Sequence, residues 1–155
     1  MTSIERDCPA ATARLQILMA DDDPIFAALA STSLSRAGFA VHVARDGLEA
    51  LELLERSGFD LALIDLSMPR VDGFRLIAMI RSTPRLRRLP IVVLSSRADA
   101  ASVEEAYALG ADAFQSKPVN WTLLPVHLRH IQKCASRPDV RDVQTSRPAP
   151  YLGRA

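Results

Sequence analysis

The sequence predicts an α/β domain in which a parallel sheet is covered by helices on both faces. Short apolar segments alternate with segments that have the spacing of amphipathic helices, which is the pattern of consecutive βα units. Several apolar segments are almost continuously hydrophobic, as strands are when both faces of their sheet are covered. The 155 residues correspond to one domain, at roughly 150 residues per domain.

Five apolar segments are expected to form the strands, and the first, third and fourth are almost continuously apolar. In chain order, the predicted strands are residues 15–20, 40–43, 61–65, 91–94 and 113–116. Parallel strands joined by helices require right-handed crossovers, which leave few possible topologies.

Five helices are expected after these strands, because apolar residues there recur at intervals of three and four positions. The defining positions of the first four are Phe26, Leu29, Ala30 and Leu34; Leu48, Leu51 and Leu54; Phe74, Ile77 and Ala78; and Val103, Ala106, Tyr107 and Leu109. The fifth helix is expected to run from Trp121, a packing anchor, to about Cys134.

Aspartates mark the beginnings of three helices. Asp23, Asp46 and Asp99 can each accept hydrogen bonds from the first backbone N–H groups of a helix. Pro24 follows Asp23 at the first helical position, and Glu49 stands three residues after Asp46, as in a capping box.

Glycines mark the ends of three helices. Gly38, Gly58 and Gly110 each precede an apolar residue, which predicts a left-handed C-terminal cap closed by a hydrophobic contact. The last helix is less regular, because Asn120 can cap it but Pro125 would then lie past its first turn. That helix is therefore expected either to begin at Pro125 or to be kinked there.

The two ends of the chain differ from the rest. Residues 1–13 and the proline-containing segment 135–155 have no apolar periodicity, so both are expected to be flexible around a domain at 14–134. Cys8 and Cys134 lie far apart and match no metal-binding or disulfide pattern, so reduced thiols are expected.

The overall charge excludes several classes of protein. The chain carries 19 basic and 18 acidic residues, a net charge of +1, which argues against nucleic-acid or membrane-surface partners. No apolar run approaches the roughly 18–20 residues of a membrane span. The first residues are charged where a signal peptide would be apolar, so a cytoplasmic protein is expected.

Chemically capable residues gather where four predicted strands end, and open parallel sheets bind ligands at that edge. These residues are Asp21, Asp22, Asp23, Asp65, Ser95, Ser96, Arg97 and Lys117. Of the three consecutive acids, Asp23 is best interpreted as the helix cap alone.

Their chemistry suits a metal ion and a phosphoryl group. Asp21, Asp22 and Asp65 would place three carboxylates close together, where they repel unless a cation lies among them. Oxygen ligands without His or Cys favour Mg²⁺. Asp65 can act as a carboxylate nucleophile that forms an acyl phosphate, while Lys117 and Ser95 can bind the oxygens of that group.

The chain resembles the receiver domain of bacterial two-component response regulators over about residues 14–134. The matching segments are Ile17–Asp23, Leu63–Pro69, Asp72-Gly73, Leu94–Ser96, Gly110–Asp112 and Lys117-Pro118. The resemblance implies a flavodoxin-like, doubly wound sheet with strand order 2-1-3-4-5, as in chemotaxis receivers. It also implies a cis peptide before Pro118.

Site roles follow from the resemblance. It makes Asp65 the phosphoacceptor and Asp22 a direct Mg²⁺ ligand, with Asp21 binding through water and Ser67 through its backbone carbonyl. The roles at the other three positions are phosphoryl binding for Lys117, phosphoryl binding and switching for Ser95, and aromatic switching for Phe114. In Phe114 the phenol of the commoner tyrosine is missing. We hypothesise that Ser67 and Arg97 together set the dephosphorylation rate. Exchange of either side chain without a change in that rate would refute the hypothesis.

The resemblance implies a signalling module rather than an enzyme. A histidine kinase or phosphotransfer protein would supply the phosphoryl group, and the switched surface would bind an unknown target or form a phosphorylation-dependent homodimer. A phosphatase is disfavoured because Ser67 occupies the position of the required acid.

Two alternatives remain. One is a phosphorylation-independent scaffold. The other is an N-terminal receiver fragment of a regulator with a cyclic di-guanylate output domain, which the stretch Pro118–Leu124 suggests. His42, His127 and His130 are interpreted as ordinary surface or half-packed residues, and the arginines 81, 85, 87 and 88 as a solvated face.

Overall fold

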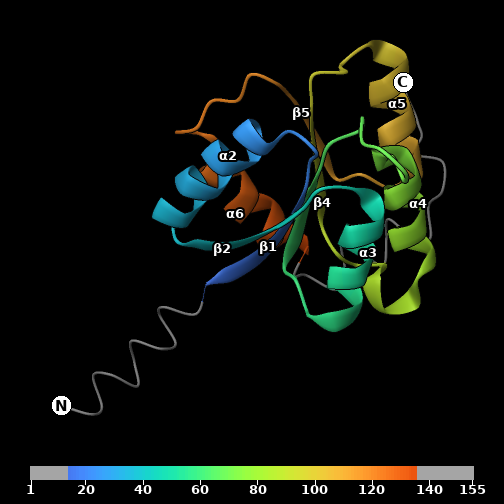
Figure 1. Cartoon of the computed structure of the whole chain (residues 1–155), viewed down its shortest axis with the longest axis horizontal. Coiled ribbons are helices and arrows are strands. Elements are labelled where there is room, and N and C mark those ends of the chain that lie inside the picture. The colour runs from blue at the N-terminus through green and yellow to red at the C-terminus, as the bar shows by residue number, and fades with distance from the viewer. Residues whose placement is uncertain (1–13, 136–155) are drawn as a thin grey trace.

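The computed structural model describes residues 14–135, in which five strands alternate with five α-helices and one short 3-10 helix (Figure 1). The strands are β1 Leu15–Ala20, β2 Phe39–Ala44, β3 Leu61–Ile64, β4 Ile91–Ser95 and β5 Ala113–Ser116. The helices are α2 Pro24–Arg36, α3 Gly47–Arg56, α4 Gly73–Ser82, α5 Ala100–Leu109 and α6 Leu124–Ala135, with the 3-10 helix η1 at Pro84–Leu86. Every predicted strand and helix is present in the described part.

The strands form one parallel sheet in the order β2-β1-β3-β4-β5. The register pairs Ala20 with Ala44 on one side and with Ile64 on the other, so β1, β2 and β3 end at the same level. This confirms the predicted flavodoxin-like topology.

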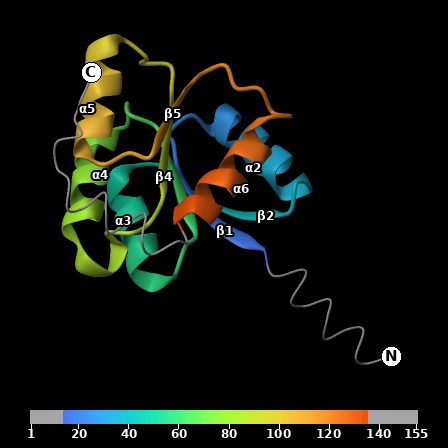
Figure 2. The ribbon, with the colours of Figure 1, turned by 180° about the vertical axis from the view of Figure 1, so that it is seen from behind.

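The helices cover the two faces of the sheet unequally. In two opposite views, α2 and α6 lie on one face and α3, α4 and α5 on the other (Figures 1 and 2). Strand side chains alternate between the two layers. Ile17 and Met19 pack on the α2–α6 side, whereas Leu18 and Ala20 pack on the side of α3, α4 and α5. Burial on both faces explains the continuous apolar runs.

The capping aspartates behave as the sequence predicts. Asp23 accepts from the N–H groups of Ile25 and Phe26, Asp46 from that of Glu49, and Asp99 from that of Ser102; these are the beginnings of α2, α3 and α5. The capping box at α3 differs in one bond, because the Glu49 carboxylate accepts from the N–H of Arg45 instead of that of Asp46.

Two of the three predicted glycine caps are confirmed. Gly38 has φ of 100° and Gly110 has φ of 120°, both in the left-handed region. The prediction at Gly58 was wrong, because it does not have positive φ. Ser57 ends α3 in an extended conformation (φ −137°, ψ 157°), so the chain turns toward β3 without a left-handed residue.

The last helix begins one residue before Pro125. The side chain of Asn120 accepts from the N–H groups of Thr122 and Leu123, forming a separate turn, and α6 then starts at Leu124. Pro125 lies in the first turn, where a helical N–H has no partner within the helix, so its missing donor has no consequence there. The alternative of a kinked helix is therefore excluded.

The predicted flexible segments lie outside the described residues, except for Ala135, which ends α6. Cys8 also lies outside them. Cys134 is an exposed free thiol. Within residues 14–135, no helix has both the length and the apolar character needed to cross a membrane.

Candidate functional site

Three carboxylates meet at the carboxyl edge of the sheet. Asp21, Asp22 and Asp65 each offer an oxygen, and these oxygens lie within 4.8 Å of one another. Extension of the strand ladder holds two of them: the Asp21 N–H donates to the carbonyl of Ala44 (3.0 Å) and the Asp65 N–H to that of Ala20 (2.9 Å). The three acids that the sequence assigns to one site are therefore brought together.

Burial and charge make the cluster electrostatically unbalanced. Asp21 and Asp65 are only 2% and 7% exposed, whereas Asp22 faces solvent. Burial is the main cause that raises the pKa of Asp65, and the neighbouring charge of Asp21 adds to it. Lys117, the Ser95 hydroxyl and the Ser67 backbone N–H act in the opposite direction. A bound cation would relieve the remaining repulsion.

Lys117 reaches the cluster from the end of β5. Its Nζ lies 2.8 Å from an Asp21 oxygen and 3.8 Å from an Asp65 oxygen. Its backbone N–H donates to the carbonyl of Ser95 (3.0 Å), which extends the β4–β5 ladder. The peptide between Lys117 and Pro118 is cis, as the resemblance implies. One ammonium group thus contacts both buried carboxylates.

Ser95 and Arg97 occupy different surroundings although they are two residues apart. Ser95 is 1% exposed and hydrogen-bonded to Asp65, and its Oγ accepts from the Arg97 N–H (3.0 Å). The Arg97 side chain instead donates to the Ser102 hydroxyl (3.0 Å) and lies over the Phe74 ring (5.3 Å). In this structure the Arg97 guanidinium is engaged with α4 and α5.

The other two predicted site residues differ in position. Ser67 lies at the border of the cluster, whereas Phe114 lies apart from it. Ser67 is exposed, and its backbone N–H bonds to the Asp65 carboxylate. Phe114 is half-buried and packs against the core beneath α3, α4 and α5. Phe114 lies on β5 and is not one of the clustered carboxylates, so its switching role stays a prediction.

The start of α4 packs directly against the site. A Cβ on Gly73 would stand 2.3 Å from the carbonyl oxygen of Asp65 and 2.7 Å from the Cα of Leu66. The Gly73 N–H donates to the Leu66 carbonyl (3.0 Å), and Asp72 caps the helix. Only glycine leaves room for this approach, which explains the Asp72-Gly73 motif in physical terms.

An ion pair that the sequence analysis missed supports the loop after Asp65. Arg70 has φ of 66°, the single non-glycine residue with positive φ among residues 14–135. Its side chain donates to the Asp46 carboxylate at 2.5 and 3.1 Å, joining this loop to the beginning of α3. No sequence pattern indicates this pairing, because the two residues are 24 positions apart.

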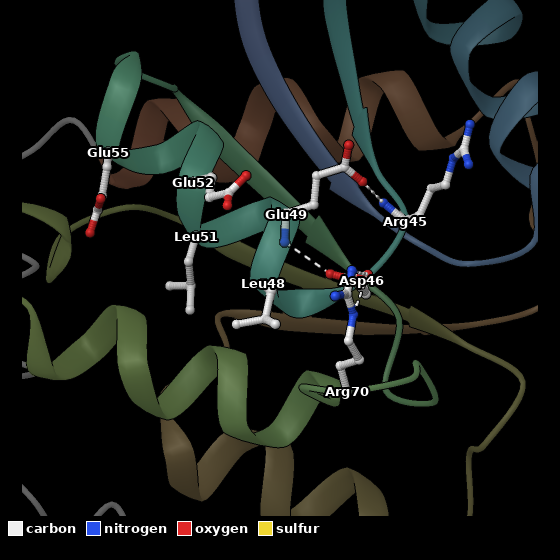
Figure 3. A pocket seen from close by; sticks show the side chains of 8 residues that line it. All are labelled: Arg45, Asp46, Leu48, Glu49, Leu51, Glu52, Glu55 and Arg70. Carbon is white, nitrogen blue, oxygen red and sulfur yellow. Dashed lines mark hydrogen bonds and ion pairs between the residues drawn. The ribbon is translucent and has the colours of Figure 1, made fainter.

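A pocket of about 600 Å³ lies beside this ion pair (Figure 3), and none of the three clustered carboxylates lines it. Its lining residues are Arg45, Asp46, Leu48, Glu49, Leu51, Glu52, Glu55 and Arg70. The three histidines also lie elsewhere: His42 bonds Gln16, while His127 and His130 are exposed on α6. Within the described residues, the three aspartates are the single group of three or more acidic, His or Cys residues close enough to share a metal ion.

A buried aspartate beside a lysine and a carboxylate cluster, on the carboxyl edge of a 2-1-3-4-5 sheet, defines a receiver-type signalling domain. Residues 17–129 match the family model of the response regulator receiver domain. The chain belongs to this family.

Known proteins agree with this assignment. The chain is 37% identical over 107 residues to the gliding motility regulatory protein of Myxococcus xanthus, covering 69% of this chain and 14% of that protein. It is 36% identical over 121 residues to the transcriptional regulatory protein AfsQ1 of Streptomyces coelicolor, covering 78% and 52%. A sensor protein from Polaromonas sp. has a similar structure, with a TM-score of 0.74, 31% identity and coverage of 79% and 98%. The chain spans about half or less of the curated relatives it matches.

Proposed function

We propose that this receiver domain accepts a phosphoryl group on Asp65 and thereby switches a protein-binding surface. The observation that carries the proposal is the position of Asp65, which is buried and adjacent to two acids and one lysine. A carboxylate in these surroundings has a nucleophilic oxygen and a cationic neighbour for the incoming oxygens.

The carboxylate cluster suits Mg²⁺ as the cofactor. Its ligand atoms are all oxygens, and its charge is only partly balanced by Lys117. Asp21, Asp22 and Asp65 would hold the ion together with the Ser67 backbone carbonyl, with Asp21 binding through water. When bound, Mg²⁺ would supply positive charge for the oxygens of the phosphoryl group.

The transfer step assigns a role to each side chain. An Asp65 oxygen forms a bond to phosphorus as the phosphorus–nitrogen bond of a phosphohistidine donor breaks, and the histidine ring leaves. Lys117 neutralises one phosphoryl oxygen, and the Ser95 hydroxyl donates a hydrogen bond to another. The movement of Ser95 toward the phosphoryl group would be transmitted through β5 and Phe114 and would change the protein-binding surface.

The partners follow from the family. A histidine kinase or histidine phosphotransfer protein would donate the phosphoryl group, and a target protein or a second copy would bind the switched surface. We place the domain in the cytoplasm, where receiver domains typically act. A phosphatase activity is disfavoured because the side chain at Ser67 cannot act as a carboxylic acid.

The test is the intact mass of the protein after incubation with Mg²⁺ and acetyl phosphate, beside an Asp65→Asn variant. We expect the wild type to gain one phosphoryl mass, and the variant and a magnesium-free sample to gain none. If the wild type remains unmodified with acetyl phosphate and with phosphorylated kinases, and beryllofluoride does not bind, the phosphorylation-independent scaffold replaces this proposal.

A further inference from the structure

The ammonium group of Lys117 has an aromatic neighbour in addition to the two carboxylates. Its Nζ lies 3.9 Å from the centre of the Phe26 ring, well within the distance of a cation–π contact. The Trp121 ring packs against Phe26 in turn, with centroids 5.4 Å apart and planes inclined by 41°. Lys117 therefore lies between an acidic wall and an aromatic wall.

Local structure places both aromatic rings at this edge. Asp23 caps α2 and Pro24 begins it, so Phe26 is the third residue of the helix. Side chains on a helix lean toward its N-terminus, which here directs Phe26 toward the carboxyl edge of the sheet. Trp121 comes from the turn between β5 and α6, and both rings are half-buried against the α2–α6 core.

A lysine needs such a wall to hold a fixed position. Its four-carbon stem is flexible, and its charged end makes no directional fork as arginine does. The carboxylates of Asp21 and Asp65 attract Nζ from one side, and the ring of Phe26 restricts it on the other. A π face attracts an ammonium ion.

We propose that Phe26 is a positioning residue that holds the Lys117 ammonium in line with Asp65, and that Trp121 keeps the Phe26 ring in place. The inference rests on the proposed phosphoryl transfer and extends it to a residue on α2. Loss of the contact between Phe26 and Lys117 should change the rate of Asp65 phosphorylation by about two- to thirty-fold. This is the range of cation–π contacts from exposed to desolvated sites.

The first measurement is the rate of Asp65 phosphorylation by acetyl phosphate. Phe26→Leu keeps an apolar side chain but removes the π face, so we expect the rate to fall by about two- to thirty-fold. Phe26→Tyr restores the ring and the rate. Phe59→Leu is the matched control, because Phe59 is also half-buried and aromatic but precedes β3 at the opposite edge. Equal rates in Phe26→Leu and the wild type would overturn the inference.

The second measurement does not depend on phosphorylation. The chain has only two lysines, so trace acetylation with acetic anhydride can be read as the ratio of modified Lys117 to modified Lys133, which is exposed. The ring of Phe26 covers one side of Nζ and the Lys117 side chain is only 15% exposed, so the ratio reports the access of the reagent to Nζ. We expect Phe26→Leu to raise the ratio several-fold, and Phe26→Tyr and Phe59→Leu to leave it unchanged.

The two measurements separate the possible failures. An unchanged labelling ratio in Phe26→Leu overturns the inference even if the protein is phosphorylated. A raised ratio in a protein that cannot be phosphorylated supports Phe26 as the residue that holds Lys117 and overturns phosphoryl transfer as the function. Matching melting temperatures of the variants establish that each is folded.

Discussion

The surroundings of Asp65 disfavour the ionised form of its carboxyl group. Its carboxyl group is buried beside Asp21, and both conditions raise its pKa above the ordinary 3.8. The folded state therefore binds this proton more tightly than the unfolded state does, and stability falls as the pH rises through the interval between the two pKa values. At neutral pH the ionised Asp65 destabilises the metal-free domain.

Replacement of Asp65 by asparagine should therefore stabilise the metal-free protein at pH 7. We expect the free energy of unfolding to rise by about 1 kcal/mol, the scale of one like-charge contact at about 4 Å in water. The gain should vanish below the ordinary pKa of aspartate, where the wild-type carboxyl is protonated too. Urea unfolding at several pH values measures both effects.

Mg²⁺ supplies the control for this prediction. The ion should raise the melting temperature of the wild type and have a much smaller effect on Asp65→Asn, because binding to the folded state stabilises it by mass action. A variant that is less stable than the wild type at pH 7 without metal would show that Asp65 is not under electrostatic stress.

At the scale of elements, the absence of a side chain at the first residue of α4 lets this helix approach the site closely. The helix begins at Gly73, where any side chain would overlap the backbone of Asp65 and Leu66. The same principle operates at the beginning of α3, where a Cβ on Gly47 would stand 2.5 Å from the carbonyl oxygen of Val71. Two helices thus approach the loop after β3 at backbone distance.

Gly73→Ala should consequently disturb the site as well as the fold. Insertion of a methyl group into this contact costs about 1–3 kcal/mol through overpacking, and the displaced Asp65 backbone should weaken Mg²⁺ binding. Gly58→Ala is the matched control, because no atom lies within 4 Å of the added Cβ and the backbone is not left-handed. Titration with Mg²⁺, followed by Trp121 fluorescence, measures the effect; equal affinities in both variants would contradict it.

The same residues show what a sequence reveals about a fold. Caps such as Asp23 and strands such as residues 15–20 are local, so pattern and spacing predict them. Asp65 and Lys117 are distant in the chain, but the topology of a parallel sheet and the family resemblance place both at one edge. The contact between Phe26 and Lys117 has no such signal, because helical spacing marks Phe26 only as a core residue.

At the scale of the whole molecule, the two edges of the sheet have separate roles. Arg81, at the end of α4, joins several segments of the chain at the edge opposite the carboxylates. It donates to the carbonyls of Arg87 (2.9 Å), Leu89 (2.6 Å) and Gly110 (2.8 and 3.0 Å), and it pairs with Asp112 at 2.9 Å. This one guanidinium joins α4, the segment before β4, and the segment between α5 and β5. The prediction that Arg81 belongs to a solvated face was therefore wrong, because its side chain is only 15% exposed and is bonded to these segments.

Arg81→Ala should therefore reduce stability without changing the chemistry of the site. Loss of a partly buried guanidinium leaves several carbonyls and Asp112 without one donor, which predicts a fall of about 2–4 kcal/mol in the free energy of unfolding. Phosphorylation of the folded variant at 25 °C should proceed at the wild-type rate, because the three carboxylates, Ser95 and Lys117 lie at the other edge. The matched control is Arg75→Ala, an exposed arginine on the same helix, which should change neither quantity. A folded Arg81→Ala protein that loses phosphorylation would show instead that the two edges are coupled through α4.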